Sequence, residues 1–233
     1  MSSDSLDILA FGAHPDDVEI GMAGTIAKQV EAGSRVGICD LTRAEMSSNG
    51  TVELRQQEAA AASAVLGLSA RSCLDLPDRG LTGSEEQIAA VTAEIRKARP
   101  RIVFAPYWQD RHPDHIACSR LIEQAVFNAK LRRYLPELPP VSVEQLIFYY
   151  INDVEAVNLM VDVSAHYEKK RQALGCYRSQ FEAAAPGEDR VVTPLTGAYI
   201  ANVEARDRLL GSQRTWAFAE GFAVKRPQPI HLF

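Results

Sequence analysis

The sequence of 233 residues has a formal net charge of −5, with 46% hydrophobic and 24% charged residues, which is an ordinary globular composition. A chain of this length suits one domain with a substantial core, and we expect a single domain over residues 1–233. The acidic balance argues against a general nucleic-acid-binding protein, because such proteins need a surplus of Lys and Arg to neutralise phosphates.

The N-terminal segment shows neither the basic region nor the long apolar run of a signal peptide. No stretch approaches the roughly 18 uncharged apolar residues that indicate a membrane span. The four cysteines, at positions 39, 73, 118 and 176, are widely spaced and form no Cys-x-x-Cys pair. These features predict a cytoplasmic protein with reduced thiols and without a membrane partner.

Strand and helix patterns alternate along much of the chain. The expected strands are Leu6–Gly12, Arg35–Thr42, Ser72–Leu76, Arg101–Tyr107, Glu144–Ile151 and Asn158–Val163. The expected helices are Gly21–Ala32, Val52–Leu66, Glu85–Ala98, Pro113 to about Leu131, Ala165–Tyr177 and Thr193–Gln213, the last with Arg206 and Arg208 facing outward. This alternation predicts an α/β fold with a mostly parallel sheet flanked by helices.

Three further segments carry no regular pattern. Arg43–Gly50 is polar and predicts a loop beside the site, and Ala183–Arg190 predicts a flexible loop. The tail AEGFAVKRPQPIHLF, residues 219–233, is expected to line the site or a subunit contact.

The segment Ala13–Glu19 places His14, Asp16 and Asp17 at the carboxyl end of the first expected strand, where ligands bind in open α/β sheets. His14 and Asp17 could bind one divalent metal ion through nitrogen and oxygen. Asp16 would then face a metal-bound water. Alternatively, Asp16 or Asp17 only caps the following helix, and the motif alone does not decide between the two.

A second histidine cluster, Arg111–His115, also follows an expected strand. One of its histidines could join His14 and Asp17 in a three-ligand set with an open position, which is the pattern of a catalytic zinc site. Zinc is the default metal, and iron(II) also suits nitrogen and oxygen ligands. Cys118 is expected to be a small buried residue rather than a thiolate ligand, and His166 a surface residue.

The segments AHPDDVEIG and HPDH resemble the LmbE/PIG-L family of metal-dependent N-acetylglucosaminide deacetylases. LTRAE, ELRQQE, YRSQF and AEGFAVKRP extend the resemblance over nearly the whole chain and are similar to the bacillithiol-biosynthesis branch, which deacetylates N-acetylglucosaminyl-malate. The resemblance implies a Rossmann-like fold, a metal site at the carboxyl ends of the strands, hydrolysis of an amino-sugar amide, and a homo-oligomer, with a hexamer as one arrangement.

The resemblance also implies roles for individual residues. His14, Asp17 and His115 match the metal ligands, and Asp16 matches the general base. His112 matches the histidine that acts on the tetrahedral intermediate and the leaving group. The amine would receive its proton from Asp16 or His112, and the sequence does not choose between them.

Three arginines and one tyrosine complete the expected site. Arg55 matches an arginine of the substrate pocket, although on a helix it could equally pair with Glu58. Tyr199 matches a tyrosine that supports the oxyanion. The malate conjugate carries two carboxylates, for which Arg55, Arg111 and Arg178 are the candidate partners. Arg43, on the polar loop, is a further candidate. Ala44 departs from the family pattern, which commonly has glycine there.

Two other functions remain open at this stage. A deacetylase of the same family could act on a chitooligosaccharide or on another thiol precursor, with the same metal site and a different pocket. A non-catalytic nucleotide-binding α/β module is the more distant alternative. The sequence contains neither G-x-G-x-x-G nor a Walker motif, and carboxylates at the strand end would repel phosphate.

Overall fold

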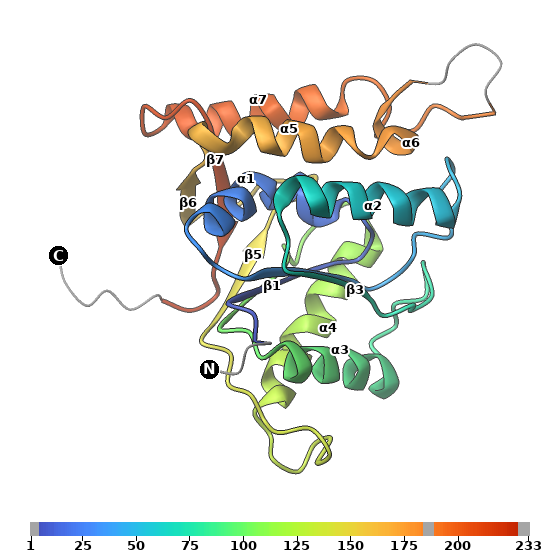
Figure 1. The fold of residues 1–233 in the computed structure, drawn as a ribbon, viewed down its shortest axis with the longest axis vertical. Coiled ribbons are helices and arrows are strands. Elements are labelled where there is room, and N and C mark those ends of the chain that lie inside the picture. The colour runs from blue at the N-terminus through green and yellow to red at the C-terminus, as the bar shows by residue number, and fades with distance from the viewer. Residues whose placement is uncertain (1–4, 184–188, 228–233) are drawn as a thin grey trace.

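A seven-stranded sheet runs through the computed structural model, which describes residues 5–183 and 189–227 (Figure 1). The strands are β1 (Ile8–Gly12), β2 (Val36–Asp40), β3 (Ala70–Cys73), β4 (Ile102–Pro106), β5 (Gln145–Tyr149), β6 (Leu159–Asp162) and β7 (Ala219–Ala223). Their order in the sheet is β3-β2-β1-β4-β5-β7-β6. Strands β1 to β5 are parallel, and β7 is antiparallel to both of its neighbours. The expected α/β fold with a mostly parallel sheet is confirmed.

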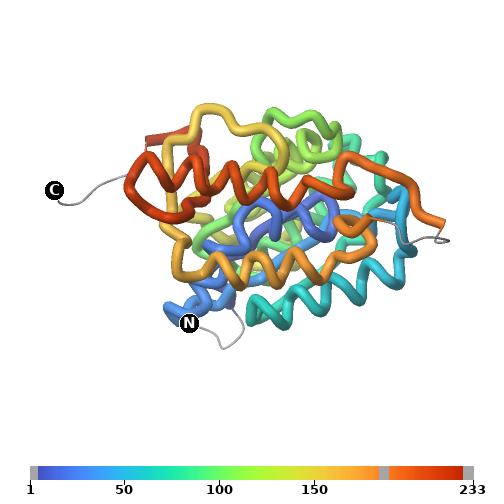
Figure 2. Tube along the Cα trace, turned by 90° about the horizontal axis from the view of Figure 1, so that it is seen from above, coloured from blue at the N-terminus to red at the C-terminus, as the bar shows by residue number. Residues whose placement is uncertain are grey.

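Helices cover both faces of this sheet. They are α1 (Asp17–Glu31), α2 (Val52–Leu66), α3 (Glu85–Ala98), α4 (Pro113–Ala129), α5 (Tyr167–Gly175), α6 (Arg178–Phe181) and α7 (Tyr199–Ser212), with a 3-10 turn η1 at Ser164–His166. Helices α3 and α4 cover one face, and α1 and α2 cover the other (Figure 1). Helices α5 and α7 run alongside each other on the outer side of α1 (Figure 2). None of these described helices has the length and apolar character needed to cross a membrane.

The register of the central strands positions the site. Strand β1 lies between β2 and β4, with Ile8 opposite Ile102 and Ala10 opposite Phe104. The chain leaves β1 towards one side of the sheet and leaves β4 towards the other, since α1 and α4 cover opposite faces. This is the topological switch point at which open α/β sheets bind ligands. The two histidine-containing loops therefore meet at one edge of the sheet.

Local signals set the bounds of α2 and α3, which agree with the expected ranges. The Thr51 side chain accepts a hydrogen bond from the Leu54 N–H and caps α2, and Gly67 ends that helix with a φ of 69°. The Ser84 side chain caps α3 in the same way. Arg99 ends it in a left-handed conformation directly before Pro100.

Helix α1 begins at Asp17, four residues before the expected Gly21, and is bent at Met22, where φ is −151°. The bend frees the N–H groups of Gly24 and Thr25, which donate hydrogen bonds to the Glu220 carboxylate. Glu220 thus acts as an N-terminal cap inside the helix, supplied by a distant strand.

Two expectations for the last third of the chain were wrong. Residues 219–223 of the tail form the buried strand β7 instead of lining the site, and residues 228–233 lie outside the described residues. Helix α7 begins at Tyr199 rather than at Thr193. The expected loop at Ala183–Arg190 lies largely outside the described residues, which exclude 184–188.

Helices α5 and α7 are joined to β7 by a buried ionic cluster. Lys170 is completely buried, and its Nζ donates to Asp207 and to Glu220, each at 2.7 Å. Arg206 was expected to face outward, but it binds Asp207 and backbone carbonyls, and only 15% of its side chain is exposed. Arg208 does face outward, as expected, with 56% of its side chain exposed.

Replacing Lys170 with Met should lower the free energy of unfolding by about 3–5 kcal/mol, because it leaves the buried Glu220 carboxylate without its cation and Asp207 with Arg206 alone. Chemical denaturation would measure this change. The matched control is Lys169→Met at the neighbouring exposed position, which should change the free energy by less than about 0.5 kcal/mol. An equally small effect of Lys170→Met would show that the cluster contributes little to stability.

Candidate metal centre and active site

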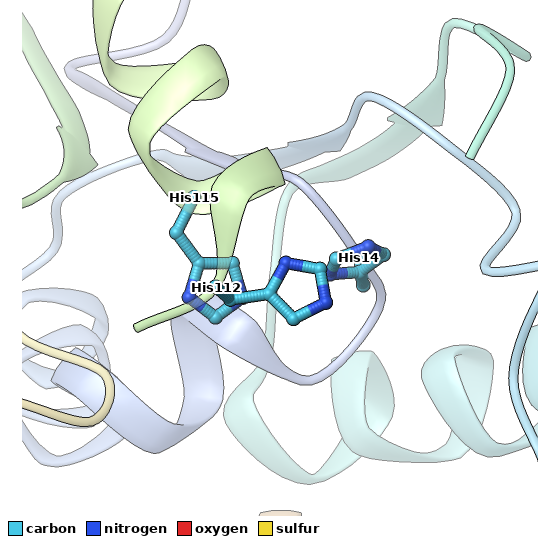
Figure 3. A group of neighbouring side chains, drawn as sticks. All are labelled: His14, His112 and His115. Carbon is cyan, nitrogen blue, oxygen red and sulfur yellow. The ribbon is translucent and has the colours of Figure 1, made fainter. Parts of the chain in front are cut away.

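Three histidines from the two loops meet at the carboxyl ends of β1 and β4. Figure 3 shows His14 from the loop after β1, and His112 and His115 from the start of α4, gathered at one point. The ring centroid of His14 lies 4.9 Å from that of His112 and 5.6 Å from that of His115. One ring nitrogen of each histidine lies within 4.8 Å of the others, which is close enough for a shared metal ion.

The Asp17 carboxylate contacts two of these histidines. Its Oδ2 lies 3.5 Å from His14 Nδ1, and its Oδ1 lies 3.1 Å from His115 Nε2. Oδ2 also accepts the His14 N–H at 2.9 Å. Neither Asp16 nor Asp17 caps α1 with its side chain, so the capping alternative does not describe the first motif.

The other nitrogens of His14 and His115 face carboxylates. His14 Nε2 lies 3.1 Å from Asp78 Oδ1 and 3.5 Å from Asp114 Oδ2, and His115 Nδ1 lies 3.0 Å from Asp110 Oδ1. Histidines that bind metals usually donate their second N–H to such a group, which fixes the ring. Sequence reasoning missed Asp78 and Asp110. Asp78 follows β3 and Asp110 follows β4, so both lie in loops at the same edge of the sheet as His14. This position is the feature of the sequence that could have identified them.

This set of donors fits a divalent metal ion. Two imidazoles and one carboxylate are buried together, and further carboxylates orient the rings. His14, Asp78 and Asp114 form a second group whose ligand atoms lie within 4.8 Å of one another, but it shares His14 with the group of three histidines. Cys118 is completely buried, as expected, and the two groups do not contain it. His166 lies away from both and contacts Glu31.

Asp16 has an unusual backbone conformation, with a φ of 115°. A non-glycine residue holds such a conformation only where the surrounding structure imposes it. It turns the Asp16 side chain away from Asp17 and towards Arg55, whose Nη2 donates to Asp16 Oδ2 at 3.0 Å. Burial raises the pKa of Asp16 to about 7, and the Arg55 charge opposes this rise.

Arg55 is buried and faces the cavity rather than solvent. Its Nε donates to the Pro15 carbonyl at 2.9 Å, and its guanidinium lies 5.7 Å from the centre of the Tyr177 ring. Glu58, the alternative partner, instead accepts hydrogen bonds from the backbone and hydroxyl of Ser179. The surface ion pair between Arg55 and Glu58 is therefore not formed.

His112 is fixed by its own helix. Its Nδ1 accepts the Asp114 N–H at 3.2 Å and caps α4. Burial and the neighbouring His115 and His14 lower the pKa of His112. The neutral ring therefore carries its proton on Nε2, where it can act as a hydrogen-bond donor.

A cavity of about 570 Å³ opens over these groups. Arg55, Arg111 and Tyr199, which the sequence had singled out, line it, and Arg79 lines it although it had not been singled out. Arg178 does not line it, because its side chain is 73% exposed and paired with Glu182.

Tyr199 and Arg43 have well-defined partners. The Tyr199 hydroxyl donates to Asn152 Oδ1 at 3.2 Å, and its ring stacks on Phe181. Burial raises the pKa of Tyr199, so its hydroxyl keeps its proton. Arg43 pairs with Asp75 at the surface and does not reach the cavity.

Comparison with known proteins identifies the protein family of the chain. The model of the PIG-L family, described as GlcNAc-PI de-N-acetylase, matches residues 9–126, which include both histidine loops. The chain belongs to the PIG-L family. The family consists of metal-dependent amidohydrolases, and this chain is accordingly an enzyme of that class.

Relatives within the family act on different amino sugars. The chain is 31% identical to the diacetylchitobiose deacetylase of Thermococcus kodakarensis, over 77% of this chain and 72% of the relative. It is 26% identical to the 1D-myo-inositol 2-acetamido-2-deoxy-alpha-D-glucopyranoside deacetylase of Nakamurella multipartita, over 82% of this chain and 86% of the relative.

Two solved structures share the fold. The conserved protein TT1542 from Thermus thermophilus has a TM-score of 0.88 and 40% identity, with 97% of each chain covered. The N,N'-diacetylchitobiose deacetylase from Pyrococcus horikoshii has a TM-score of 0.80 and 26% identity, covering 94% of this chain and 84% of the other.

Metal binding to this PIG-L chain should strengthen as the pH rises to about 9. Burial lowers the pKa of His115, but the Asp17 and Asp110 carboxylates raise it further, to about 9, and the pKa of His14 is also raised. Both rings must lose a proton before they bind a metal ion, so the affinity falls as the pH falls. Calorimetry in buffers of different ionisation enthalpy would count the released protons.

The control for this measurement is His166→Gln, which removes a histidine outside the cavity and should leave the pH dependence unchanged. A metal affinity that stays constant between about pH 6 and 9 would contradict the prediction, since it would mean that no imidazole loses a proton on binding.

Proposed function

We propose that the protein hydrolyses the acetamide of a substrate that contains N-acetylglucosamine, with a divalent metal ion bound by His14, Asp17 and His115. Zinc is the default ion and iron(II) the alternative. The observation that carries this proposal is the position of the Asp17 carboxylate in contact with both histidines, whose second ring nitrogens face carboxylates. The names of the deacetylase relatives support the same reaction.

A divalent ion held there would lower the pKa of a bound water and polarise the acetyl carbonyl. Asp16 accepts the proton of the attacking water. Its carboxylate is buried and held by Arg55, and a pKa raised to about 7 allows it to accept a proton and to return one near neutral pH. Because Asp16 can return the proton that it accepts, we assign the protonation of the leaving amine to Asp16.

His112 and Tyr199 then stabilise the oxyanion of the tetrahedral intermediate. Because His112 Nδ1 is occupied by the Asp114 N–H, the proton on Nε2 is the one that faces the reaction. His112 serves as a neutral hydrogen-bond donor rather than as an imidazolium. The protonated hydroxyl of Tyr199 lines the same cavity and can supply a second hydrogen bond once its proton turns from Asn152 Oδ1 to the oxyanion.

For the substrate, we propose N-acetylglucosaminyl-malate, as the resemblance to the bacillithiol branch implies. Arg79 and Arg111 line the cavity and can bind the two malate carboxylates. Arg55 lines it too, and its Nη1 has no hydrogen-bond partner among the described residues, which suits a contact with a sugar hydroxyl. Arg178 is left out of the pocket because of its surface pair with Glu182.

Diacetylchitobiose is the second candidate substrate. It is favoured by the relatives from Thermococcus and Pyrococcus, whose names give that substrate. The metal centre would be the same for both, so only the arginines at the cavity discriminate between an anionic and a neutral aglycone.

An assay of released acetate separates these substrates. The metal-loaded protein is incubated with N-acetylglucosaminyl-malate, diacetylchitobiose and free N-acetylglucosamine. We expect the malate conjugate to react fastest, and Arg111→Gln to slow its reaction more than that of diacetylchitobiose. Faster reaction of diacetylchitobiose, with no effect of Arg111→Gln, would discard the anionic substrate. Absence of acetate from all three would contradict the proposed reaction.

Replacing Asp16 with Asn should lower kcat by about 10²–10⁴, because general acid–base help from one group contributes about that factor. The substitution keeps the shape of the side chain, so metal content should stay near that of the unmodified protein. Metal analysis together with acetate release would test both statements. Full activity of Asp16→Asn would remove Asp16 from the mechanism.

A further inference from the structure

Asp78 lies in the turn that follows β3 and is in contact with the metal centre. Its side chain is 5% exposed and lines the cavity, and its Oδ1 lies 3.1 Å from His14 Nε2. The opposite nitrogen, His14 Nδ1, faces Asp17. A carboxylate on Nε2 holds the proton there and leaves the Nδ1 lone pair for the metal ion.

The second oxygen of Asp78 binds a different part of the chain. Oδ2 accepts the Met46 N–H at 3.0 Å, and the Asp78 N–H donates to Glu45 Oε1 at 2.7 Å. Met46 belongs to the loop Arg43–Gly50, from which Met46, Ser47 and Ser48 line the cavity. One carboxylate therefore contacts both a candidate metal ligand and the loop at the cavity.

Asp114 also approaches His14 Nε2, but at 3.5 Å. Its two oxygens accept the backbone N–H of Arg79 at 2.9 Å and the Arg79 guanidinium at 3.0 Å. These bonds fix the turn that carries Asp78 against α4. Asp78, at the shorter distance, is the partner of the imidazole, and Asp114 holds that partner in place.

We propose that Asp78 is a positioning residue that orients His14 for metal binding and couples the metal centre to the loop Arg43–Gly50. The inference rests on the proposed function, because it takes His14 as a metal ligand. A bound ion would fix the His14 ring, and the ring would in turn fix the Asp78 carboxylate. Because this carboxylate accepts the Met46 N–H, metal binding should also order the loop Arg43–Gly50 over the cavity.

The first test is the zinc affinity, measured by competition with a chromophoric chelator. Asp78→Asn should weaken zinc binding by about 10–100-fold, as loss of a carboxylate behind a metal-bound histidine does. The matched control is Asp75→Asn, which removes a carboxylate three residues away that is paired with Arg43 and does not contact His14. Its zinc affinity should stay within about twofold of the unmodified protein. Equal affinities of the two variants would overturn the orienting role.

The second test follows hydrogen exchange of the loop Arg43–Gly50 with and without zinc. We expect zinc to slow the exchange of the Met46 N–H several-fold in the unmodified protein and in Asp75→Asn, and to have no such effect in Asp78→Asn. Exchange of Met46 that does not respond to zinc in the unmodified protein would refute the coupling.

Two further measurements separate the role of Asp78 from that of His14 and from a failure to fold. His14→Ala should lose zinc binding, and if it does not, the proposed ligand set fails independently of Asp78. If Asp78→Asn does not fold, nitrogen NMR of the unmodified zinc-bound protein still decides. We expect zinc on Nδ1 and a proton on Nε2 of His14, whereas zinc on Nε2 would exclude Asp78 as its partner.

Discussion

Buried negative charge is the constraint on which this structure depends. Among the described residues, seven carboxylates whose side chains are each less than 10% exposed surround the carboxyl ends of the central strands: Asp16, Asp17, Glu19, Asp40, Asp78, Asp110 and Asp114. Arg71 reaches Asp40 and Glu19, and Arg55 reaches Asp16. Burial still raises the pKa of Asp40 to about 6 against the Arg71 charge. A buried ion without a partner is strongly destabilising. The arginines and a bound divalent ion would together neutralise the negative charge of these buried carboxylates.

The left-handed backbone at Asp16 turns two neighbouring carboxylates towards different partners. Asp17 turns towards His14 and His115, whereas Asp16 turns towards Arg55. The strained conformation costs of order 1–3 kcal/mol, which the contacts of both carboxylates offset. In the proposed function, the proton acceptor and one metal ligand are therefore consecutive residues.

Local signals explain which features could be predicted from the sequence. The bounds of α2 and α3 followed from their caps, and two histidine motifs, each placed after an apolar strand, predicted that His14, His112 and His115 come together. Features that depend on tertiary contacts were missed. Strand β7 is short and contains Glu220 and Gly221, so it lacks a strand pattern and pairs only because β5 and β6 flank it. Arg178 was expected in the pocket and is exposed, whereas Arg206 was expected to be exposed and is largely buried. Periodicity does not show which carbonyls or carboxylates a long side chain can reach.

The bond from Gly24 to Glu220 spans 196 positions of the chain. During synthesis, both histidine loops and the six strands β1 to β6 are complete before Glu220 leaves the ribosome. Until then, the bend in α1 has two N–H groups without an acceptor, and Lys170 lacks one of its two carboxylates. Closing so long a loop is slow, because the chain must lose conformational entropy before the stabilising contact between its ends can form. The nascent chain would therefore carry the proposed metal ligands His14, Asp17 and His115 before the final strand secures helix α1.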